Sequence, residues 1–439
     1  NNGVSLFDPF RETFRNFKDV SGIHYTMQGA VYNVYKTSDG RIWVGTVSDL
    51  CYFDSKDTDL ILSGKKDVNH MFIQDIYWGI SNPTVHSVFE DSFKNVWIGS
   101  NGGGASFISS TSSFFHSWKI NKIPGVTNGL NDKEVLTICV ADNGNVWMGT
   151  DGGGINVNKD GKNGTIYSHN TGEISSNAYH SSLKDSNGDL WFGNMYNEIG
   201  IDIFLSKENR FTHYTPQGNN SIIYCLFEDN QRNVWIGSSN GLEIYNLITK
   251  KKDFLNKDNS QLLTNEIRAV SQDKNGNIWI GTLNRGISIY NPESKTMKHI
   301  NEHTIFENCA INQIFRDSKN RIWIATTEGL VLFPDEQSDA YQLFNTQNGL
   351  ACNLVCSIEE DSEGNIWLST HSGISCFFEP EKRFLNYDHK DGTLFGTYMN
   401  NSVGKTQDGT IYFGSINGVC YFNPNDRPSN IILPPVIFA

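Results

Sequence analysis

The chain has 439 residues, of which 38% are hydrophobic, and its mean hydropathy of -0.41 describes a polar sequence. No run of 18 consecutive apolar residues occurs, so the sequence predicts no membrane-spanning helix. Its formal net charge is -13, and we therefore expect no nucleic-acid partner and no contact of this region with an anionic membrane, since both need a basic surface.

A motif of an aromatic, an apolar, a small and a polar residue recurs about every 44 residues. Before its first copy, residues 4–7 and 13–17 predict two short strands, which resemble the end of a repeat whose beginning is missing. A fixed period of this size indicates one supersecondary unit copied many times, so function is expected where the copies differ. The nine copies begin at Trp43, Trp97, Trp147, Trp191, Trp235, Trp279, Trp323, Trp367 and Tyr412.

The copy at residues 264–299 shows what one unit contains. Alternating apolar residues predict strands at 267–271, 278–282, 287–290 and 296–300, separated by turns rich in Gly, Asn and Pro. A lone four-stranded meander cannot bury both of its faces, whereas copies arranged radially can. Each unit is therefore predicted to be one blade of a β-propeller. The Trp is expected to be a wedge between blades, and the following Gly to let the next sheet approach closely.

Neither the turns that precede the Trp residues nor the cysteines indicate a site for a cofactor or a metal, and we expect none. An Asp stands six residues before the Trp in six copies, and Asp142 stands one residue nearer, so we expect an Asx-type turn. These turns lack the Gly and the acidic residue that a calcium loop places at positions six and twelve. The eight cysteines include no CxxC and are expected to be buried apolar residues. Cys352 and Cys356 form the one close pair, for which we expect no disulfide.

Blade counting predicts an all-β fold with a seven-bladed ring. Seven evenly spaced units run from Trp147 to Tyr412, which places the ring at residues 119–430. The last unit has no fourth strand of its own, and the ring can close by borrowing the stretch 114–118. Residues 1–118 are then expected to be the last blades of a preceding propeller in a longer protein. The alternative is a single enlarged ring of all nine repeats.

The repeat resembles the two-component regulator propeller repeat, most clearly at 233–242, 276–282 and 364–367. This resemblance implies the periplasmic sensor region of a hybrid two-component regulator. It implies an oligosaccharide ligand, control of polysaccharide-utilisation genes and a homodimer in the full-length sensor histidine kinase. No catalytic activity is expected of this region. Residues 431–439 resemble the start of a following immunoglobulin-like domain.

Candidate ligand residues lie in the loops between the second and third strands and in the loops between blades. Aromatic planes, carboxylates, amides and arginine forks are the groups that hold sugars. Two alternatives remain open: a propeller glycosidase or lyase, which needs a placed acid–base pair, and a non-catalytic protein-interaction scaffold. The candidates are Tyr179, Tyr196, Glu198, Arg268, Arg285, Glu328, His371, Tyr398 and Asn400.

Overall fold

The computed structural model describes residues 4–16, 30–63, 68–71, 82, 84–108, 114–120, 129–159, 162–195, 200–217, 221–301, 304–334 and 340–427. Two compact units are present, one of residues 1–113 with 428–439 and one of residues 114–427. The second unit begins before the expected boundary at residue 119, because a strand at 116–118 belongs to it. The expected start of an immunoglobulin-like domain at 431–439 lies outside the described residues.

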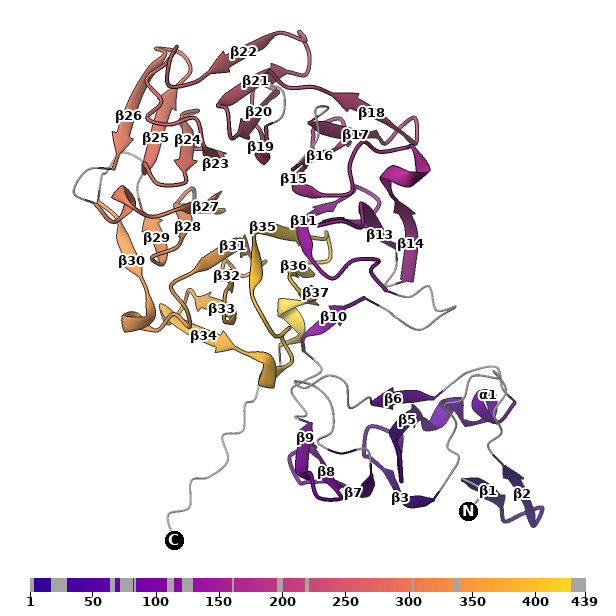
Figure 1. Cartoon of the computed structure of the whole chain (residues 1–439). Coiled ribbons are helices and arrows are strands. Elements are labelled where there is room, and N and C mark those ends of the chain that lie inside the picture. The colour runs from indigo at the N-terminus through magenta and orange to yellow at the C-terminus, as the bar shows by residue number, and fades with distance from the viewer. Residues whose placement is uncertain are drawn as a thin grey trace. The chain divides into compact units, whose positions relative to one another are not determined.

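The second unit is a ring of seven four-stranded antiparallel sheets, which we number as blades 1 to 7 (Figure 1). Blades 1 to 6 each consist of four consecutive strands, the first of which is the innermost. Blade 1 has β11 (Val135–Val140), β12 (Val146–Thr150), β13 (Ile155–Lys159) and β14 (Lys162–Tyr167). Blade 2 has β15 (Tyr179–Lys184), β16 (Leu190–Asn194), β17 (Ile201–Leu205) and β18 (Arg210–Tyr214). Blade 3 has β19 (Ile223–Glu228), β20 (Asn233–Ser238), β21 (Leu242–Asn246) and β22 (Lys252–Leu255).

The later blades repeat this order. Blade 4 has β23 (Ile267–Gln272), β24 (Ile278–Thr282), β25 (Ile287–Asn291) and β26 (Thr296–Ile300), which confirms the four strands predicted for this copy. Blade 5 has β27 (Ile311–Arg316), β28 (Ile322–Thr326), β29 (Leu330–Phe333) and β30 (Gln342–Phe344). Blade 6 has β31 (Val355–Glu360), β32 (Ile366–Thr370), β33 (Gly373–Phe378) and β34 (Arg383–Tyr387). Short 3-10 helices stand at His169–Thr171, Ile305–Glu307, Thr346–Asn348, His389–Asp391 and Pro424–Asp426.

Blade 7 closes the ring with strands from both ends of the unit. Its inner three strands are β35 (Tyr398–Lys405), β36 (Ile411–Ser415) and β37 (Gly418–Phe422), and its outer strand is β10 (His116–Trp118). β10 pairs antiparallel with β37, which confirms the predicted borrowing. The Ser402 hydroxyl on β35 donates to the Val135 carbonyl on β11 over 3.1 Å. Blades 7 and 1 are therefore neighbours, and the alternative of one nine-unit ring is wrong.

The hydrophobic core lies between blades, because every sheet buries its faces against its neighbours. Trp235, Trp279, Trp323 and Trp367 are each at most 1% exposed. A Cβ atom added to Gly281 would lie 2.4 Å from Ile311, the first residue of the next inner strand, so this position needs a residue without a side chain. Both predicted roles, the Trp as wedge and the Gly as the point of close approach, agree with this packing.

In six copies, the Asp six residues before the Trp holds the turn and the indole together. In blade 4, Asp273 accepts from the backbone N–H groups of Asn275 and Asn277 and from the Trp279 indole N–H over 3.2 Å. Blade 1 differs, because the residue six before Trp147 is Ala141. The Trp147 indole N–H is buried without a hydrogen-bond partner. The expectation that Asp142 plays the Asp role is therefore wrong, since it stands one residue too late.

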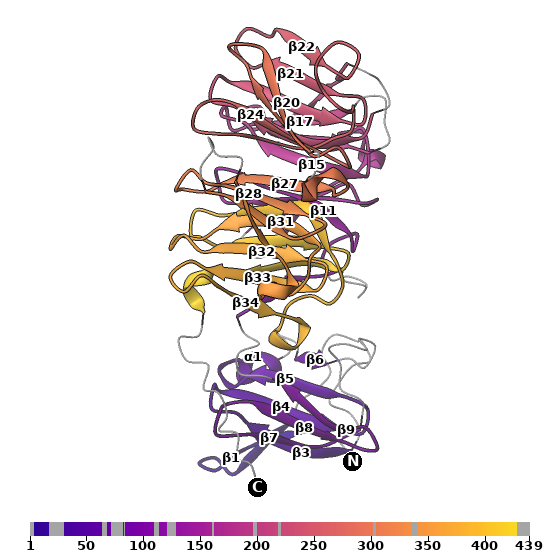
Figure 2. The same ribbon diagram turned by 90° about the vertical axis from the view of Figure 1, so that its left-hand side faces the viewer.

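The N-terminal unit contains blade-like sheets of the same design, two of them carrying copies of the motif. Figure 2 shows its strands from a second direction. The sheets are a hairpin, a four-stranded sheet and a sheet with three described strands. They comprise β1 (Ser5–Asp8) and β2 (Thr13–Asn16); β3 (Val31–Lys36), β4 (Arg41–Thr46), β5 (Leu50–Asp54) and β6 (Asn69–Met71); and β7 (Val85–Glu90), β8 (Val96–Ser100) and β9 (Gly104–Ile108). A 3-10 turn (Ser55–Asp57) and α1 (Thr58–Leu62) follow β5.

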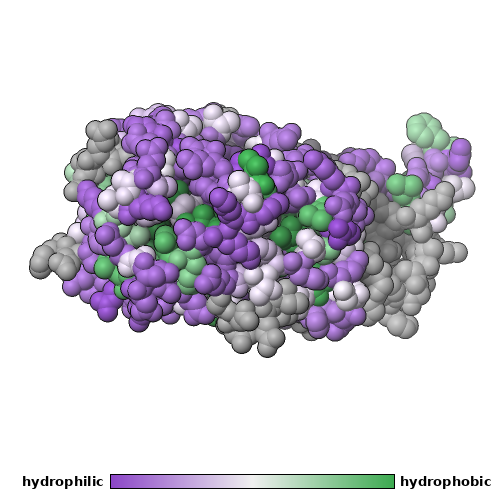
Figure 3. Space-filling model, turned by 90° about the horizontal axis from the view of Figure 1, so that it is seen from above, coloured by the Kyte–Doolittle hydropathy of each residue, from purple (hydrophilic) through white to green (hydrophobic). Residues whose placement is uncertain are grey.

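All eight cysteines are free, including Cys352 and Cys356, and seven of them are buried. No helix among the described residues is long and apolar enough to cross a membrane. Seen from above, the described surface is mainly hydrophilic, with hydrophobic side chains only in small separate groups (Figure 3).

Candidate functional site

One end of the ring gathers the loops in which ligand residues were expected. In every blade of the ring except blade 4, the residue after the motif donates its backbone N–H to the carbonyl of the residue just before the inner strand of the same blade. Ser239 donates to Ile222 over 3.1 Å, and His371 donates to Leu354 over 3.1 Å. The loops between second and third strands therefore lie beside the starts of the inner strands. We call this end of the ring the loop face.

Four of the predicted residues lie on the loop face with exposed side chains: Arg285, Glu328, His371 and Asn400. Two of their loops are anchored by the motif hydroxyl, because Thr282 accepts from the Arg285 backbone N–H over 2.9 Å and Thr326 accepts from that of Glu328 over 3.0 Å. Partial burial lowers the pKa of His371, which favours its neutral form. These side chains come from blades 4 to 7.

Two predicted aromatic residues are corrected by the structure. Tyr179 is 0% exposed and Tyr398 is 1% exposed, so neither ring offers a surface to a ligand in this structure. Both occupy the first position of an inner strand, which packs against the preceding blade. A Cβ on Gly149 of blade 1 would lie 2.8 Å from the Tyr179 Cβ. The Tyr398 hydroxyl accepts from the Leu394 backbone N–H over 3.2 Å.

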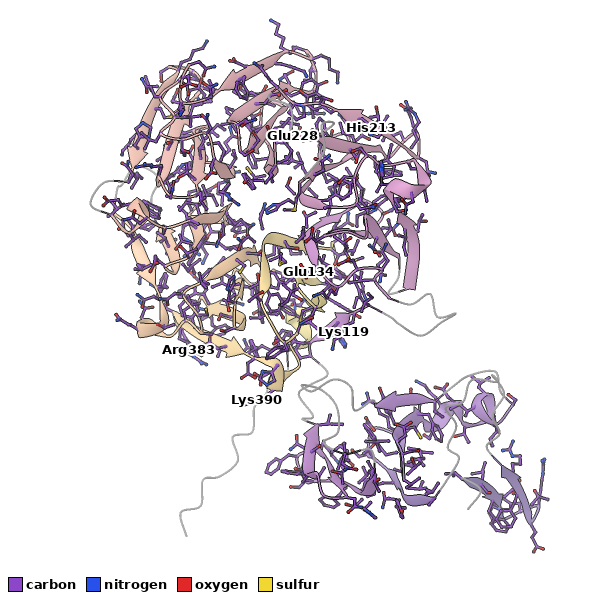
Figure 4. All side chains as sticks on the ribbon, in the orientation of Figure 1. Lys119, Glu134, His213, Glu228, Arg383 and Lys390 are labelled. Atoms are coloured by element: carbon purple, nitrogen blue, oxygen red, sulfur yellow. The ribbon has the colours of Figure 1, made fainter. Side chains whose placement is uncertain are left out.

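The Tyr179 hydroxyl takes part in a buried network around Asp202. Asp202 is 0% exposed and accepts from the Ser175 backbone N–H over 3.0 Å, from the Ser175 hydroxyl over 2.8 Å and from the Tyr179 hydroxyl. Burial, followed by the charge of Asp202, raises the pKa of Tyr179. His213 on the outer strand β18 completes the network through Nδ1 (Figure 4). The network holds blade 2 together, and the side chains of Tyr179 and Asp202 at its centre are buried. The predicted residues Tyr196 and Glu198 of the same blade lie outside the described residues.

The inner strands of blades 1 to 6 each contain a bulge at the second residue, and a different residue type stands at each of these six positions. In blades 1 to 6 the strand pairing skips one residue between the first and third positions. In blade 7 the irregular part is longer and lies between Tyr398 and Val403. The inner strands surround the axis of the ring (Figure 1). The single-residue bulges are Leu136, His180, Tyr224, Arg268, Asn312 and Cys356.

Three consecutive bulge residues contact one another across blades 2, 3 and 4. The His180 ring meets the Tyr224 ring edge to face with 5.5 Å between centroids. The Arg268 guanidinium carbon lies 3.7 Å from the centroid of the Tyr224 ring, which is a close cation–π contact. Sequence reasoning identified Arg268 but missed His180 and Tyr224. The signal that could have found them is their spacing, since 180, 224 and 268 are equivalent positions in copies 44 residues apart.

The electrostatic character of the loop face changes around the ring. Burial lowers the pKa of His180 to about 4, with a further contribution from the charge of Arg268. His180 is therefore neutral at pH 7, and Arg268 supplies the positive charge. At blade 1, burial and then the charges of Glu134 and Asp132 raise the pKa of Asp151. Glu134, just before β11, lies near the inner strands (Figure 4). The loop face thus carries acidic groups at blade 1 and a cationic group at blade 4.

A pocket at the opposite end of β19 and β23 has a structural explanation. Its lining includes Glu228, Arg232, Gln272 and Arg316. Glu228 accepts from the Ser186 backbone N–H of the preceding blade over 2.6 Å, and the Gln272 side-chain oxygen accepts from the Asn230 backbone N–H over 3.0 Å. These groups fasten the turn of one blade to the inner strand of the next. In the described part of the chain, no group of three His, Cys, Asp or Glu residues is placed to hold a metal ion.

Comparisons with known proteins place this architecture in a family. The family model named two component regulator propeller matches seven segments, each ending just beyond a Trp motif: 27–48, 79–102, 129–152, 217–240, 261–284, 305–328 and 349–372. The copies at Trp191 and Tyr412 lie outside these segments. No curated protein matches the chain.

Solved structures give the same result. The chain is 33% identical to the extracellular domain of a protein described as a hybrid two component system of B. thetaiotaomicron, with a TM-score of 0.76. The alignment covers 96% of this chain and 54% of that one, so this chain spans about half of its length. A streptogramin B lyase is 14% identical with a TM-score of 0.55, covering 72% of this chain and 99% of that one.

A virginiamycin B lyase variant of Staphylococcus aureus, solved with quinupristin, is 15% identical with a TM-score of 0.54, covering 70% of this chain and 98% of the other. At such low identity the two lyases share the propeller fold alone. The seven repeats and the similarity over nearly the whole chain agree with the ring of motif-bearing blades. The chain therefore belongs to the two component regulator propeller family and is homologous to the extracellular domain of a hybrid two component system.

Proposed function

We propose that this chain is the ligand-binding part of a periplasmic sensor, and that oligosaccharides bind its loop face. In the full-length protein, a homodimeric membrane-anchored histidine kinase would receive this signal and regulate polysaccharide-utilisation genes. The observation that carries the proposal is the 33% identity to a hybrid two component system ectodomain over 96% of the chain. Both units of the chain contain segments that match the family model.

The chemistry of the loop face supports a sugar ligand. Exposed Arg285, Glu328, His371 and Asn400 supply a charged fork, a carboxylate, an imidazole and an amide from four blades. A sugar presents hydroxyls in several directions, and such mixed donors and acceptors match them. A rigid ring of buried sheets holds the loops in place, so little ordering free energy is lost on binding.

The experiment is a thermal-shift screen of the chain against a panel of plant, microbial and host oligosaccharides, followed by chromatography of each incubated sugar. We expect one class of oligosaccharide to raise the unfolding temperature and to be recovered intact. Arg285→Ala should weaken that shift, whereas Arg383→Ala, on the outer strand β34, should leave it unchanged (Figure 4). Cleavage of the sugar would instead establish a glycosidase or lyase. A panel without any shift would favour the protein-interaction scaffold.

A further inference from the structure

Arg268 is an arginine without an anionic partner. Its Nε is buried and has no hydrogen-bond partner, and no ion pair joins its guanidinium to any residue in the described part of the chain. Elsewhere in the ring, a partly buried arginine is paired: Arg321 contacts the carboxylates of Asp317 at 2.6 Å and Glu379 at 2.9 Å. An arginine side chain stays charged at all physiological pH values. Arg268 therefore presents an uncompensated positive charge at the start of an inner strand.

Tyr224 fixes the orientation of this charge. The guanidinium lies 3.7 Å from the centroid of the tyrosine ring, so its plane is held by a residue of the preceding blade. Tyr224 is itself 7% exposed and held in the core. The guanidinium is therefore oriented before a ligand binds. Its planar fork of N–H groups can then bind two oxygen atoms at once.

His180 adds a second unsatisfied nitrogen. Its Nδ1 is also buried without a hydrogen-bond partner among the described residues. The imidazole packs in a T-shaped contact with the Tyr224 ring, with 5.5 Å between the two ring centroids. The charge of Arg268 contributes to the lowered pKa of His180, and no carboxylate contributes to it. Three blades thus place a cation and a neutral imidazole against one aromatic ring.

The other bulge residues do not extend this chemistry. The Asn312 side chain already donates to the Val355 carbonyl over 2.7 Å, and Leu136 and Cys356 are buried and carry no charge. Among the six bulge residues, the positive charge is therefore confined to Arg268 of blade 4. An uncompensated guanidinium of this kind favours an anionic group of a ligand, because charge-assisted hydrogen bonds are stronger than neutral ones.

We propose that His180, Tyr224 and Arg268 form a subsite for an anionic group of the ligand, namely the carboxylate of a uronic acid or a sulfate ester. The proposal rests on the proposed function and narrows its substrate class to acidic oligosaccharides. Arg268 binds two anionic oxygens, Tyr224 holds the guanidinium plane, and the neutral His180 ring packs against Tyr224. Because the three residues come from three adjacent blades, binding at the subsite should depend on the position of the acidic sugar along the oligosaccharide.

The test is isothermal titration calorimetry of the whole protein chain with three trisaccharides. One consists of galacturonic acid, one of galactose 6-sulfate and one of unmodified galactose. We expect at least one acidic trisaccharide to bind tenfold or more tightly than neutral galactotriose, with an affinity that falls as sodium chloride rises. The two acidic sugars distinguish a carboxylate subsite from a sulfate subsite. Arg268→Gln should abolish the preference, and Arg268→Lys should keep part of it. Arg316→Gln is the matched control, since Arg316 ends the next inner strand, β27, and is exposed.

Each failure has its own meaning. Equal binding of an acidic trisaccharide by Arg268→Gln and the unchanged chain would overturn the subsite, as would a preference for galactotriose, and both would leave the sensor function standing. No binding of these sugars or of any oligosaccharide in the panel would remove both proposals. If Arg268→Gln unfolds at a lower temperature, His180→Gln provides the second test, and it should reduce acidic binding while neutral binding is kept.

Discussion

The unpartnered Trp147 indole predicts a stabilising substitution, Ala141→Asp. In six copies of the motif, an Asp at this position accepts the indole N–H, for example Asp317 from Trp323 over 2.8 Å. Blade 1 has the same turn length, and its third residue after position 141 is Gly144 with a positive φ of 80°, as in the other copies. A carboxylate at position 141 would therefore reach the Trp147 indole as well as the backbone N–H groups of the turn.

The size of the effect follows from what the carboxylate would satisfy. A buried N–H without an acceptor loses roughly 1–3 kcal/mol, and a hydrogen bond to a charged group contributes about 1.5–3 kcal/mol. Desolvation of the new carboxylate offsets part of this gain. We expect a net increase of about 1–2 kcal/mol in the free energy of unfolding, which raises the unfolding temperature of a unit of this size by a few degrees at most. The reverse change in blade 4, Asp273→Ala, should lower the stability by roughly 2–4 kcal/mol.

The assay combines thermal unfolding of the chain with hydrogen exchange of the indole N–H groups, followed by NMR. Ala141→Asp should raise the unfolding temperature and slow the exchange of the Trp147 indole alone. Ala141→Thr is the graded control, because Thr37 at the equivalent place accepts from the Trp43 indole over a longer 3.3 Å. A lower unfolding temperature for Ala141→Asp, or an unchanged exchange rate at Trp147, would refute the assignment of position 141.

Three further substitutions test the packing and the buried charges. Asp202→Asn removes the charge that the Ser175 and Tyr179 groups stabilise, so we expect a loss of roughly 2–4 kcal/mol in urea unfolding; a loss below 1 kcal/mol would show that the charge is unimportant. Gly281→Ala forces a Cβ against Ile311 and should cost about 1–3 kcal/mol, and an unchanged unfolding temperature would contradict the close approach. The pKa of His180 is lowered from 6.5 to about 4, so the folded chain binds fewer protons than the unfolded chain in this range. Stability should be complete above pH 6.5 and fall by up to about 3 kcal/mol as the pH drops to 4, and His180→Gln should flatten this part of the profile.

The blade architecture could be predicted from the sequence because its signals are local. The alternation at 278–282 and the turns on either side define β24 without reference to any other blade. The missing fourth strand of the last unit likewise predicted the strand exchange with 116–118, because a blade with an unpaired edge must find a partner. Ring closure needs no further information once every unit has the same length.

The side chains that reach the candidate site could not be predicted from the alternation of apolar and polar residues along each strand. Tyr179 and Tyr398 were assigned to loops, yet they stand where Ile223 and Ile267 stand in other blades, and all four are buried. Comparing the copies position by position would have shown an apolar or aromatic residue there. The bulge was invisible for a different reason, since one extra residue in a strand changes which side chains face the neighbouring blade without changing the composition.

The bulge explains why the ring can keep its fold while its central chemistry varies. The first residue of an inner strand packs against the Gly of the preceding blade: a Cβ on Gly237 would lie 3.0 Å from Ile267. The third residue meets the motif strand of its own blade, because the same Cβ would lie 2.4 Å from the Cys225 sulfur. The strand pairing skips the second residue, which takes part in neither of these two contacts. Six copies carry six different residues there, and this variety makes the inner-strand bulges, with the adjoining loops, the part of the repeat in which ligand specificity is expected to arise.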